Sequence, residues 1–258
     1  MSHDKVLPGS TGGQHQLAGL IDHTETYGAH VIEKLVGRMM GIGTVVDIGA
    51  GSGRDLAIVK SRHPQCRTIA LEAGKVYAEA LAPKVDQVFT LDIERDRFPF
   101  EENSIDLFIA NQIMEHTKEV FWIFDQISRS LRVGGHLIIG VPNVLSLHNR
   151  LLGLFGVHPS QHKLYSAHVR PFSKRDTIRF VEVCSRGTFK ISAFKGSQFY
   201  PFPKSLSRLL ATAMPSMAFS IFFQFTKVGP YDGGFIKHPA AAELETNFFV
   251  GTGPSGQY

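Results

Sequence analysis

Short runs of β-branched and apolar residues alternate along the chain with segments in which apolar residues recur at helical spacing. The runs predict strands near 43–48, 67–72, 87–91, 105–110 and 135–141. The spaced segments predict helices near 25–40, 53–62, 73–82, 117–131 and 173–185. Strands that alternate with helices at this rhythm form crossover units, so the pattern predicts an α/β fold with a mostly parallel sheet and helices on both faces.

The end of the chain is less regular than its first two thirds. A sixth strand is predicted at 188–194, and two segments, 220–227 and 246–251, compete for the place of a seventh. Residues 142–172 and 196–245 break the rhythm and are predicted to be lid or cap insertions. We interpret residues 25–258 as one domain that follows a mobile segment at 1–24.

A glycine-rich turn follows the first predicted strand. Residues 45–53 read Val-Val-Asp-Ile-Gly-Ala-Gly-Ser-Gly, and a helix is predicted to begin near Arg54. Glycines allow a tight turn and a close approach of a ligand, and the start of the helix presents backbone N–H groups to a nucleotide. The dinucleotide fingerprint requires a glycine where this chain has Arg54, whereas the third glycine here comes one residue earlier, at Gly53.

An acidic residue ends each of the next two predicted strands, Glu72 after the second and Asp92 after the third. An acid at the tip of the second strand can accept hydrogen bonds from both hydroxyls of a ribose. Either acid alone is as readily explained as an exposed turn residue. Three strand-end features in this order favour a nucleoside site.

Two blocks carry a resemblance to a known family. The Asp-x-Gly-x-Gly-x-Gly pattern at 47–53 resembles the first motif of class I S-adenosylmethionine-dependent methyltransferases. The stretch at 98–143 resembles the fourth and fifth strands of the small-molecule methyltransferase family that includes ubiquinone-pathway and sugar methyltransferases. The resemblance covers roughly 40–195. Members often have proline where this chain has Val133, a departure that affects the turn and not the chemistry.

The resemblance implies a Rossmann-like, seven-stranded sheet, S-adenosyl-L-methionine as cofactor and S-adenosyl-L-homocysteine as product. Asp92 and the apolar Ile93 after it would hold the adenine, and Asn111 and Gln112 would face the methionine part. The full set of implied cofactor-binding residues is Asp47, Gly49, Ala50, Gly51, Gly53, Glu72, Ala73, Asp92, Ile93, Asn111 and Gln112.

The chemistry expected of this cofactor needs a proton acceptor when the methyl group goes to a hydroxyl. The sulfonium methyl is already activated, so the enzyme must align the acceptor and remove its proton. The candidates for the base are His116, just after the fourth strand, and His168, in the first insertion; each is also explained as a structural histidine. Glu115 can orient His116 or bind substrate, although adjacent helical residues do not face each other.

A metal centre is not predicted. His158 and His162 are four residues apart, but Pro159 interrupts a helical pair and a zinc site needs three or four ligands. Cys66 and Cys184 are too few for a disulfide scaffold, and two reduced thiols, with no signal-peptide pattern, predict a cytoplasmic protein.

The sequence favours a small-molecule acceptor: a hydroxyl of a sugar, a glycolipid intermediate or a secondary metabolite. Residues 111–114 read Asn-Gln-Ile-Met, not the Asn-Pro-Pro-Tyr of methyltransferases that act on planar amino groups. The net charge of +4 is spread without a run of five cations, which argues against a nucleic-acid partner. An RNA methyltransferase of the same fold and a non-catalytic cofactor-binding partner protein remain as alternatives.

The phenylalanine-rich part of the second insertion has two interpretations. It is either a buried helix and strand, or an apolar cap over the acceptor site, including a patch that meets a lipid-linked substrate at a membrane surface. The most apolar run, 217–225, is too short to span a bilayer. Exposure of its phenylalanines distinguishes the two interpretations.

Overall fold

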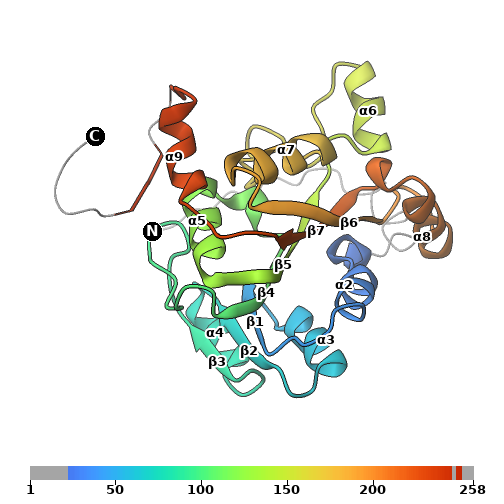
Figure 1. Cartoon of the computed structure of the whole chain (residues 1–258). Helices are drawn as coiled ribbons and strands as arrows, with labels where there is room; N and C mark the ends of the chain where they lie inside the picture. The colour runs from blue at the N-terminus through green and yellow to red at the C-terminus, as the bar shows by residue number, and fades with distance from the viewer. Residues whose placement is uncertain (1–22, 246–247, 252–258) are drawn as a thin grey trace, which may run out of the picture.

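A computed structural model describes residues 23–245 and 248–251, and in this part of the chain seven strands form one sheet (Figure 1). The strands are β1 (Thr44–Ile48), β2 (Arg67–Leu71), β3 (Gln87–Phe89), β4 (Ile105–Asn111), β5 (Leu131–Pro142), β6 (Phe189–Ser197) and β7 (Ser220–Lys227). Their order is β3-β2-β1-β4-β5-β7-β6. All neighbours are parallel except β7, which is antiparallel to both β5 and β6. The predicted fold class is confirmed, and 220–227 supplies the seventh strand.

Helices cover both faces of the sheet. The longer helices are α2 (Ala29–Val36), α3 (Arg54–Arg62), α4 (Lys75–Leu81), α5 (Val120–Ser130), α6 (Leu147–Leu154), α7 (Lys174–Cys184), α8 (Lys204–Ala213) and α9 (Gly234–Ala241). Short 3-10 turns are η1 (His23–Tyr27), η2 (Met114–His116) and η3 (Pro215–Met217). One apolar core packs α2, α3 and α4 on the sheet, and a second core packs α5, α7 and α9 on the opposite face.

The single helix predicted over 25–40 is wrong, because the chain breaks at Gly28. This glycine has φ 58°, in the left-handed region, and a Cβ atom there would lie 2.3 Å from the ring of Phe222. A 3-10 turn therefore precedes Gly28 and an α-helix follows it. The mobile segment predicted at 1–24 falls on residues 1–22, which lie outside the described residues, while 23 and 24 belong to η1.

The first insertion contains α6 and a long loop that returns to α7. The amide of Asn149 holds the two together: Nδ2 donates to Asn143 O at 3.0 Å and to Gln161 Oε1 at 2.9 Å. Its Oδ1 accepts from Ser160 N at 3.1 Å. Ser173 caps α7, its hydroxyl accepting from the N–H of Asp176. We refer to residues 143–172 as the lid.

The phenylalanine-rich run of the second insertion is core and not surface. Phe222, Phe223 and Phe225 are 0% exposed within β7, which lies between β5 and β6. Of the two interpretations, the buried one holds for these three phenylalanines, and the cap or membrane contact does not. Among the described residues, no helix has the length and apolar character needed to cross a membrane.

The ring of Phe222, on β7, packs against the backbone at Gly28. Phe222→Ala should lower the free energy of unfolding by about 3–5 kcal/mol. The side chain is 0% exposed, so its removal leaves a cavity that the sheet cannot close. Phe202→Ala, at a site 38% exposed, should cost about 1 kcal/mol or less. Urea unfolding measures both, and equal losses would contradict this account of the core.

Candidate active site

The glycine loop lies between β1 and α3, and its three glycines have different reasons to be there. Gly49, Gly51 and Gly53 have φ of 69°, 53° and 80°, all in the left-handed region. A Cβ atom would lie 2.9 Å from Ile113 at Gly49 and 2.6 Å from Leu81 at Gly53. At Gly51 the nearest atom would be 4.0 Å away, so the space beside Gly51 is open to a ligand.

Glu72 reaches this loop from the end of β2. Its Oε2 accepts from Gly51 N at 3.0 Å, and its Oε1 accepts from Gly74 N at 2.9 Å. Two backbone donors thus hold the carboxylate beside the open position, and an ionised carboxylate has lone pairs left for further donors. Of the flanking alanines, Ala50 is buried and Ala73 is exposed.

Asp47 is buried under the loop, with 3% of its surface exposed. Burial, followed by the nearby carboxylate of Asp55, raises its pKa well above the usual range, against the opposing effect of Arg54. A carboxyl group in this position is suited to supporting the loop from beneath.

Asn111 and Gln112 end β4, next to the loop. Asn111 Nδ2 donates to Asp55 Oδ2 at 2.6 Å and to Tyr27 O at 2.9 Å. Its Oδ1, like Nε2 of Gln112, is buried without a hydrogen-bond partner among the described residues. Buried polar atoms in native proteins are normally paired, so these two atoms indicate room for a polar ligand.

Tyr27 and Asp55 were missed by the sequence reasoning. Asp55 is 5% exposed and lies in the first turn of α3, directly after the loop motif, which is a signal that could have identified it. Tyr27 carries no such signal, because only the break at Gly28 brings its carbonyl to Asn111.

Asp92 lies in a turn beyond β3 and not at the tip of the strand, because β3 ends at Phe89. The turn is held locally: Asp92 Oδ1 accepts from Glu94 N at 2.9 Å, and Asp92 N donates to Asp96 Oδ2 at 2.8 Å. Asp92 is exposed, and Ile93 packs half-buried against the core. Their role toward an adenine stays a prediction.

Three titratable side chains, Glu115, His116 and His168, lie together near Gln112, and we call them the Glu115 cluster. The rings of His116, on η2, and His168, in the lid, are 4.7 Å apart between centroids. Glu115 Oε1 lies 4.0 Å from His116 Nε2, so the expectation that these adjacent residues do not face each other is wrong. His116 Nδ1 lies 3.2 Å from Ala167 O; as the donor there, it leaves the lone pair on Nε2.

The lid is fixed to the sheet at this point by its backbone. Val169 N and Arg170 N both donate to Glu115 O, at 2.9 and 3.2 Å. Arg170 Nε donates to Thr117 O at 3.1 Å. The lid therefore folds inward at this point, which places His168 beside His116.

Burial shifts two pKa values in the cluster. Burial raises the pKa of Glu115, which is 1% exposed, to about 7. Burial first, and then the neighbouring His116 and His162, lowers the pKa of His168 to about 4. A carboxyl group that titrates near neutral pH is suited to exchange a proton with a substrate.

A cavity of about 330 Å³ opens onto this cluster. It is lined by Thr26, Tyr27, Gln112, Glu115, His116, Pro142, Gln161, His168 and Phe219. Glu115 Oε2, Gln161 Nε2 and His168 Nδ1 are buried there without a hydrogen-bond partner in the described part of the chain. The cavity can thus hold a small polar molecule beside Gln112.

The same cluster is the one set of metal-type ligands within 23–245 and 248–251, since the donor atoms of Glu115, His116 and His168 lie within 4.8 Å of one another. Bonds of about 2.1 Å to a tetrahedral ion would bring the donors to about 3.4 Å from one another, closer than His116 and Glu115 now are. His158 is exposed, and both cysteines are buried free thiols. The described geometry is thus wider than a tetrahedral metal site at the His116–Glu115 pair.

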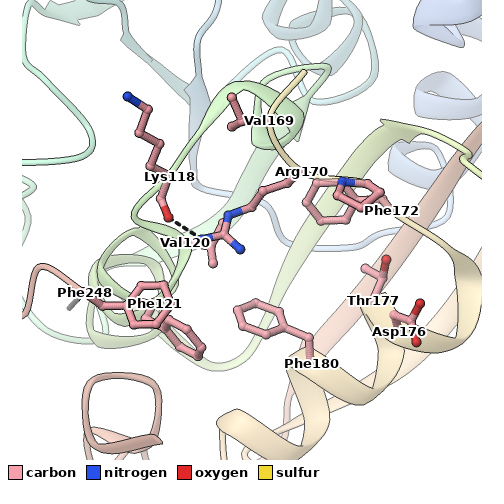
Figure 2. Close-up of a pocket in the computed structure, with 11 residues that line it drawn as sticks. Lys118, Val120, Phe121, Val169, Arg170, Phe172, Asp176, Thr177, Phe180 and Phe248 are labelled. Carbon is pink, nitrogen blue, oxygen red and sulfur yellow. Dashed lines mark hydrogen bonds between the residues drawn. The ribbon is translucent and has the colours of Figure 1, made fainter. Parts of the chain in front are cut away.

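A larger cavity of about 590 Å³ lies apart from the glycine loop, between α5, α7 and Phe248 (Figure 2). Phe121, Phe180 and Phe248 form much of its wall, and Arg170 reaches across its rim to the carbonyl of Lys118. Neither a glycine of the loop nor a residue of the Glu115 cluster lines it. Size alone therefore does not identify the reactive site, and the sequence did not predict this cavity.

Comparison with known proteins agrees with the geometry. Residues 46–139 match the family described as "Methyltransferase domain". A trans-aconitate 2-methyltransferase of Azoarcus sp. (strain BH72) is 27% identical over 99 residues, which is 38% of this chain and 39% of that protein. The chain spans less than half the length of the curated relatives it matches.

Solved structures share the fold. A possible histamine N-methyltransferase of Thermotoga maritima superposes with a TM-score of 0.55 at 18% identity, covering 79% of this chain and 90% of that one. A geranyl diphosphate C-methyltransferase of Streptomyces coelicolor A3(2) gives a TM-score of 0.53 at 14% identity, covering 86% and 87%. The chain therefore has the fold of solved methyltransferases, and residues 46–139 match a methyltransferase domain. The resemblance to one small-molecule subgroup of class I S-adenosylmethionine-dependent methyltransferases remains a prediction.

The raised pKa of Glu115 should make stability fall with pH. The carboxyl group has a pKa of about 7 when folded, against 4.5 for the ordinary group. Its contribution is fully present below pH 4.5, and it is lost as the pH rises through 7, by about 3 kcal/mol in all. Glu115→Gln should lack this fall. The free energy of unfolding of the variant, relative to that of the wild type, should therefore increase by about 3 kcal/mol between pH 4.5 and pH 7.

Urea unfolding at a series of pH values measures the difference. The exposed carboxyl group of Glu79 provides the control, because Glu79→Gln should follow the wild-type curve. Parallel curves for wild type and Glu115→Gln would show that the buried carboxyl group has an ordinary pKa.

Proposed function

We propose that the protein transfers a methyl group from S-adenosyl-L-methionine to a hydroxyl group of a small molecule. One observation carries the proposal: the consecutive residues Asn111 and Gln112 join the glycine loop to the cavity of the Glu115 cluster. A nucleoside site and a proton acceptor thus lie on either side of the end of β4.

The chain's own residues bind and align the reactants. The open space beside Gly51 receives the nucleoside, and Glu72, already fixed by two N–H donors, accepts the ribose hydroxyls. The bound cofactor supplies an activated methyl group. The cavity residues hold the acceptor oxygen in line with it, which is the main requirement for this reaction.

The proton of the acceptor goes to the cluster. With the cofactor bound, the hydroxyl proton of the acceptor would pass to His116, His168 or Glu115 as the methyl group is transferred. A base works best when its pKa lies near the working pH, which favours Glu115 at about 7 over His168 at about 4. In this mechanism His116, 4.0 Å from the carboxylate, relays or shares the proton.

Two features support a small acceptor over RNA. The cavity has a volume of about 330 Å³, and no lysine or arginine is among its lining residues. An RNA site would need cations and exposed aromatic side chains at the mouth. The similarity to a protein named for trans-aconitate points the same way. A sugar, a glycolipid intermediate or a secondary metabolite remains the class of acceptor that we propose, in a cytoplasmic enzyme.

Gly51→Val should abolish binding of S-adenosyl-L-homocysteine without unfolding the protein. The new side chain would fill the open space beside the loop. Gly41→Val is the matched control, since Gly41 also has a positive φ, 66°, and a Cβ atom there would meet nothing within 4 Å, but it lies before β1. It should suffer the same backbone strain and bind normally.

Calorimetry gives both affinities, and circular dichroism confirms folding. A folded Gly51→Val protein that binds as tightly as Gly41→Val would show that the loop does not hold the nucleoside.

His116→Ala and His168→Ala should each lower turnover by about 10²–10⁴-fold while leaving cofactor affinity nearly unchanged. Both rings line the acceptor cavity and neither contacts the glycine loop. His158→Ala, an exposed histidine of the same lid, should keep full turnover.

Steady-state kinetics with a cofactor-binding control distinguish the outcomes. The wild-type pH profile should rise through one ionisation that the inactive variants lose. Full activity in both histidine variants and in Glu115→Gln would mean that the acceptor needs no base from this cluster, and oxygen methylation would give way to nitrogen methylation.

A further inference from the structure

The lid exposes a group of large apolar side chains on its outer side. Six of them lie on α6 and the loop after it: Leu151 (50% exposed), Leu154 (79%), Phe155 (82%), Val157 (50%), Leu164 (102%) and Tyr165 (85%). We call these six residues the lid rim. Soluble monomers rarely leave so many large apolar groups together in water, and such patches mark contact surfaces.

The helix that carries Leu151 and Leu154 of the lid rim lies at an extremity of the molecule. Helix α6 projects from the body of the protein above α8 (Figure 1). The two helices are joined by apolar packing, because Leu147 of α6 and Leu210 of α8 belong to one cluster around Phe199. Helix α8 adds Leu206 and Leu209, 41% and 66% exposed. The rim is therefore accessible to a broad, flat partner.

The charged residues near the lid rim indicate what kind of partner it contacts. Neither residues 143–172 nor residues 198–219 contain a single Asp or Glu, whereas the lid carries exposed Arg150 and Lys163 beside the apolar groups. An interface between two copies of a protein has no need to exclude carboxylates. An anionic lipid surface repels them, attracts cations and accepts Leu, Phe and Tyr at the headgroup level.

We propose that the lid rim docks the protein on an anionic lipid bilayer. The apolar side chains enter the interface, and Arg150 and Lys163 meet the lipid phosphates. The same lid carries Gln161 and His168, which line the 330 Å³ cavity, so docking brings the lid side of that cavity to the bilayer. If the proposed function holds, a lipid-linked acceptor is the substrate class that this orientation favours.

Sedimentation with vesicles tests the docking without cofactor or acceptor, so its outcome is independent of methyl transfer. The wild type should bind vesicles of phosphatidylglycerol mixed with phosphatidylcholine about 30-fold more tightly than pure phosphatidylcholine, since each of two cations contributes about fivefold. The double variant Leu154→Ser/Phe155→Ser should lose on the order of 100-fold in affinity for the mixed vesicles. Arg150→Glu/Lys163→Glu should remove the preference for the anionic lipid.

The matched control is Val76→Ser/Tyr77→Ser. These two apolar side chains are also exposed, by 78% and 58%, but they lie on α4 and not on the lid. It should bind vesicles like the wild type. An unchanged circular dichroism spectrum and urea-unfolding midpoint of the rim variant show that its fold is intact. Wild-type protein that ignores both vesicles, or a folded rim variant that still binds, overturns the proposal. Loss of a dimer in the rim variant, with no vesicle binding by the wild type, would identify a second copy as the partner instead.

Discussion

Two backbone hydrogen bonds to the carbonyl of Glu115 organise the functional end of the molecule. Val169 and Arg170 donate them from the lid, while Glu115 itself belongs to the turn that follows β4. The bonds fix a short segment of the lid to the turn that follows the central strand β4. His168 on this segment lines the smaller cavity, and Val169 and Arg170 line the larger one. This attachment places His168 at the cluster, while the amide of Asn149 and the packing of Leu147 with Leu210 hold α6.

Burial of the Glu115 carboxyl group disfavours its ionised form and so destabilises the fold at high pH. Glu115 is 1% exposed, and its Oε2 has no hydrogen-bond partner among the described residues. A buried, unpartnered carboxyl group normally becomes neutral, and a pKa of about 7 expresses that penalty. Perturbed carboxyl groups of this kind concentrate at sites where proteins exchange protons with substrates. Burial is also the largest cause of the lowered pKa of His168, followed by the neighbouring His116 and His162.

The sequence predicted the parts of the fold that depend on local pattern. The strand runs, the glycine loop and Glu72 beside it all follow from residues close together in the chain. The break at Gly28 could not be predicted, because its cause is the ring of Phe222, far away in the sequence. The contact between Asp55 and Asn111 likewise forms only when β1 and β4 pair. His116 and His168 were identified as separate candidates, but their contact depends on how the lid returns to the sheet.

Apolar residues in the two insertions have opposite fates, and their spacing explains why. In β7, successive side chains point to opposite faces of the sheet, and helices cover both faces, so a continuous apolar run is buried throughout. In α6, Leu147, Leu151 and Leu154 recur at intervals of four and three, which places them along one side of a helix. Leu147 meets α8 at the inner end of that helix, but no element of the described chain covers Leu154 and Phe155 beyond it. The phenylalanine-rich run is the more apolar segment, and the sheet buries it. The leucines of α6 form a weaker apolar pattern, yet Leu151 and Leu154 are 50% and 79% exposed. An apolar surface is therefore identified by what remains uncovered once the strands have paired, and here it lies on the lid.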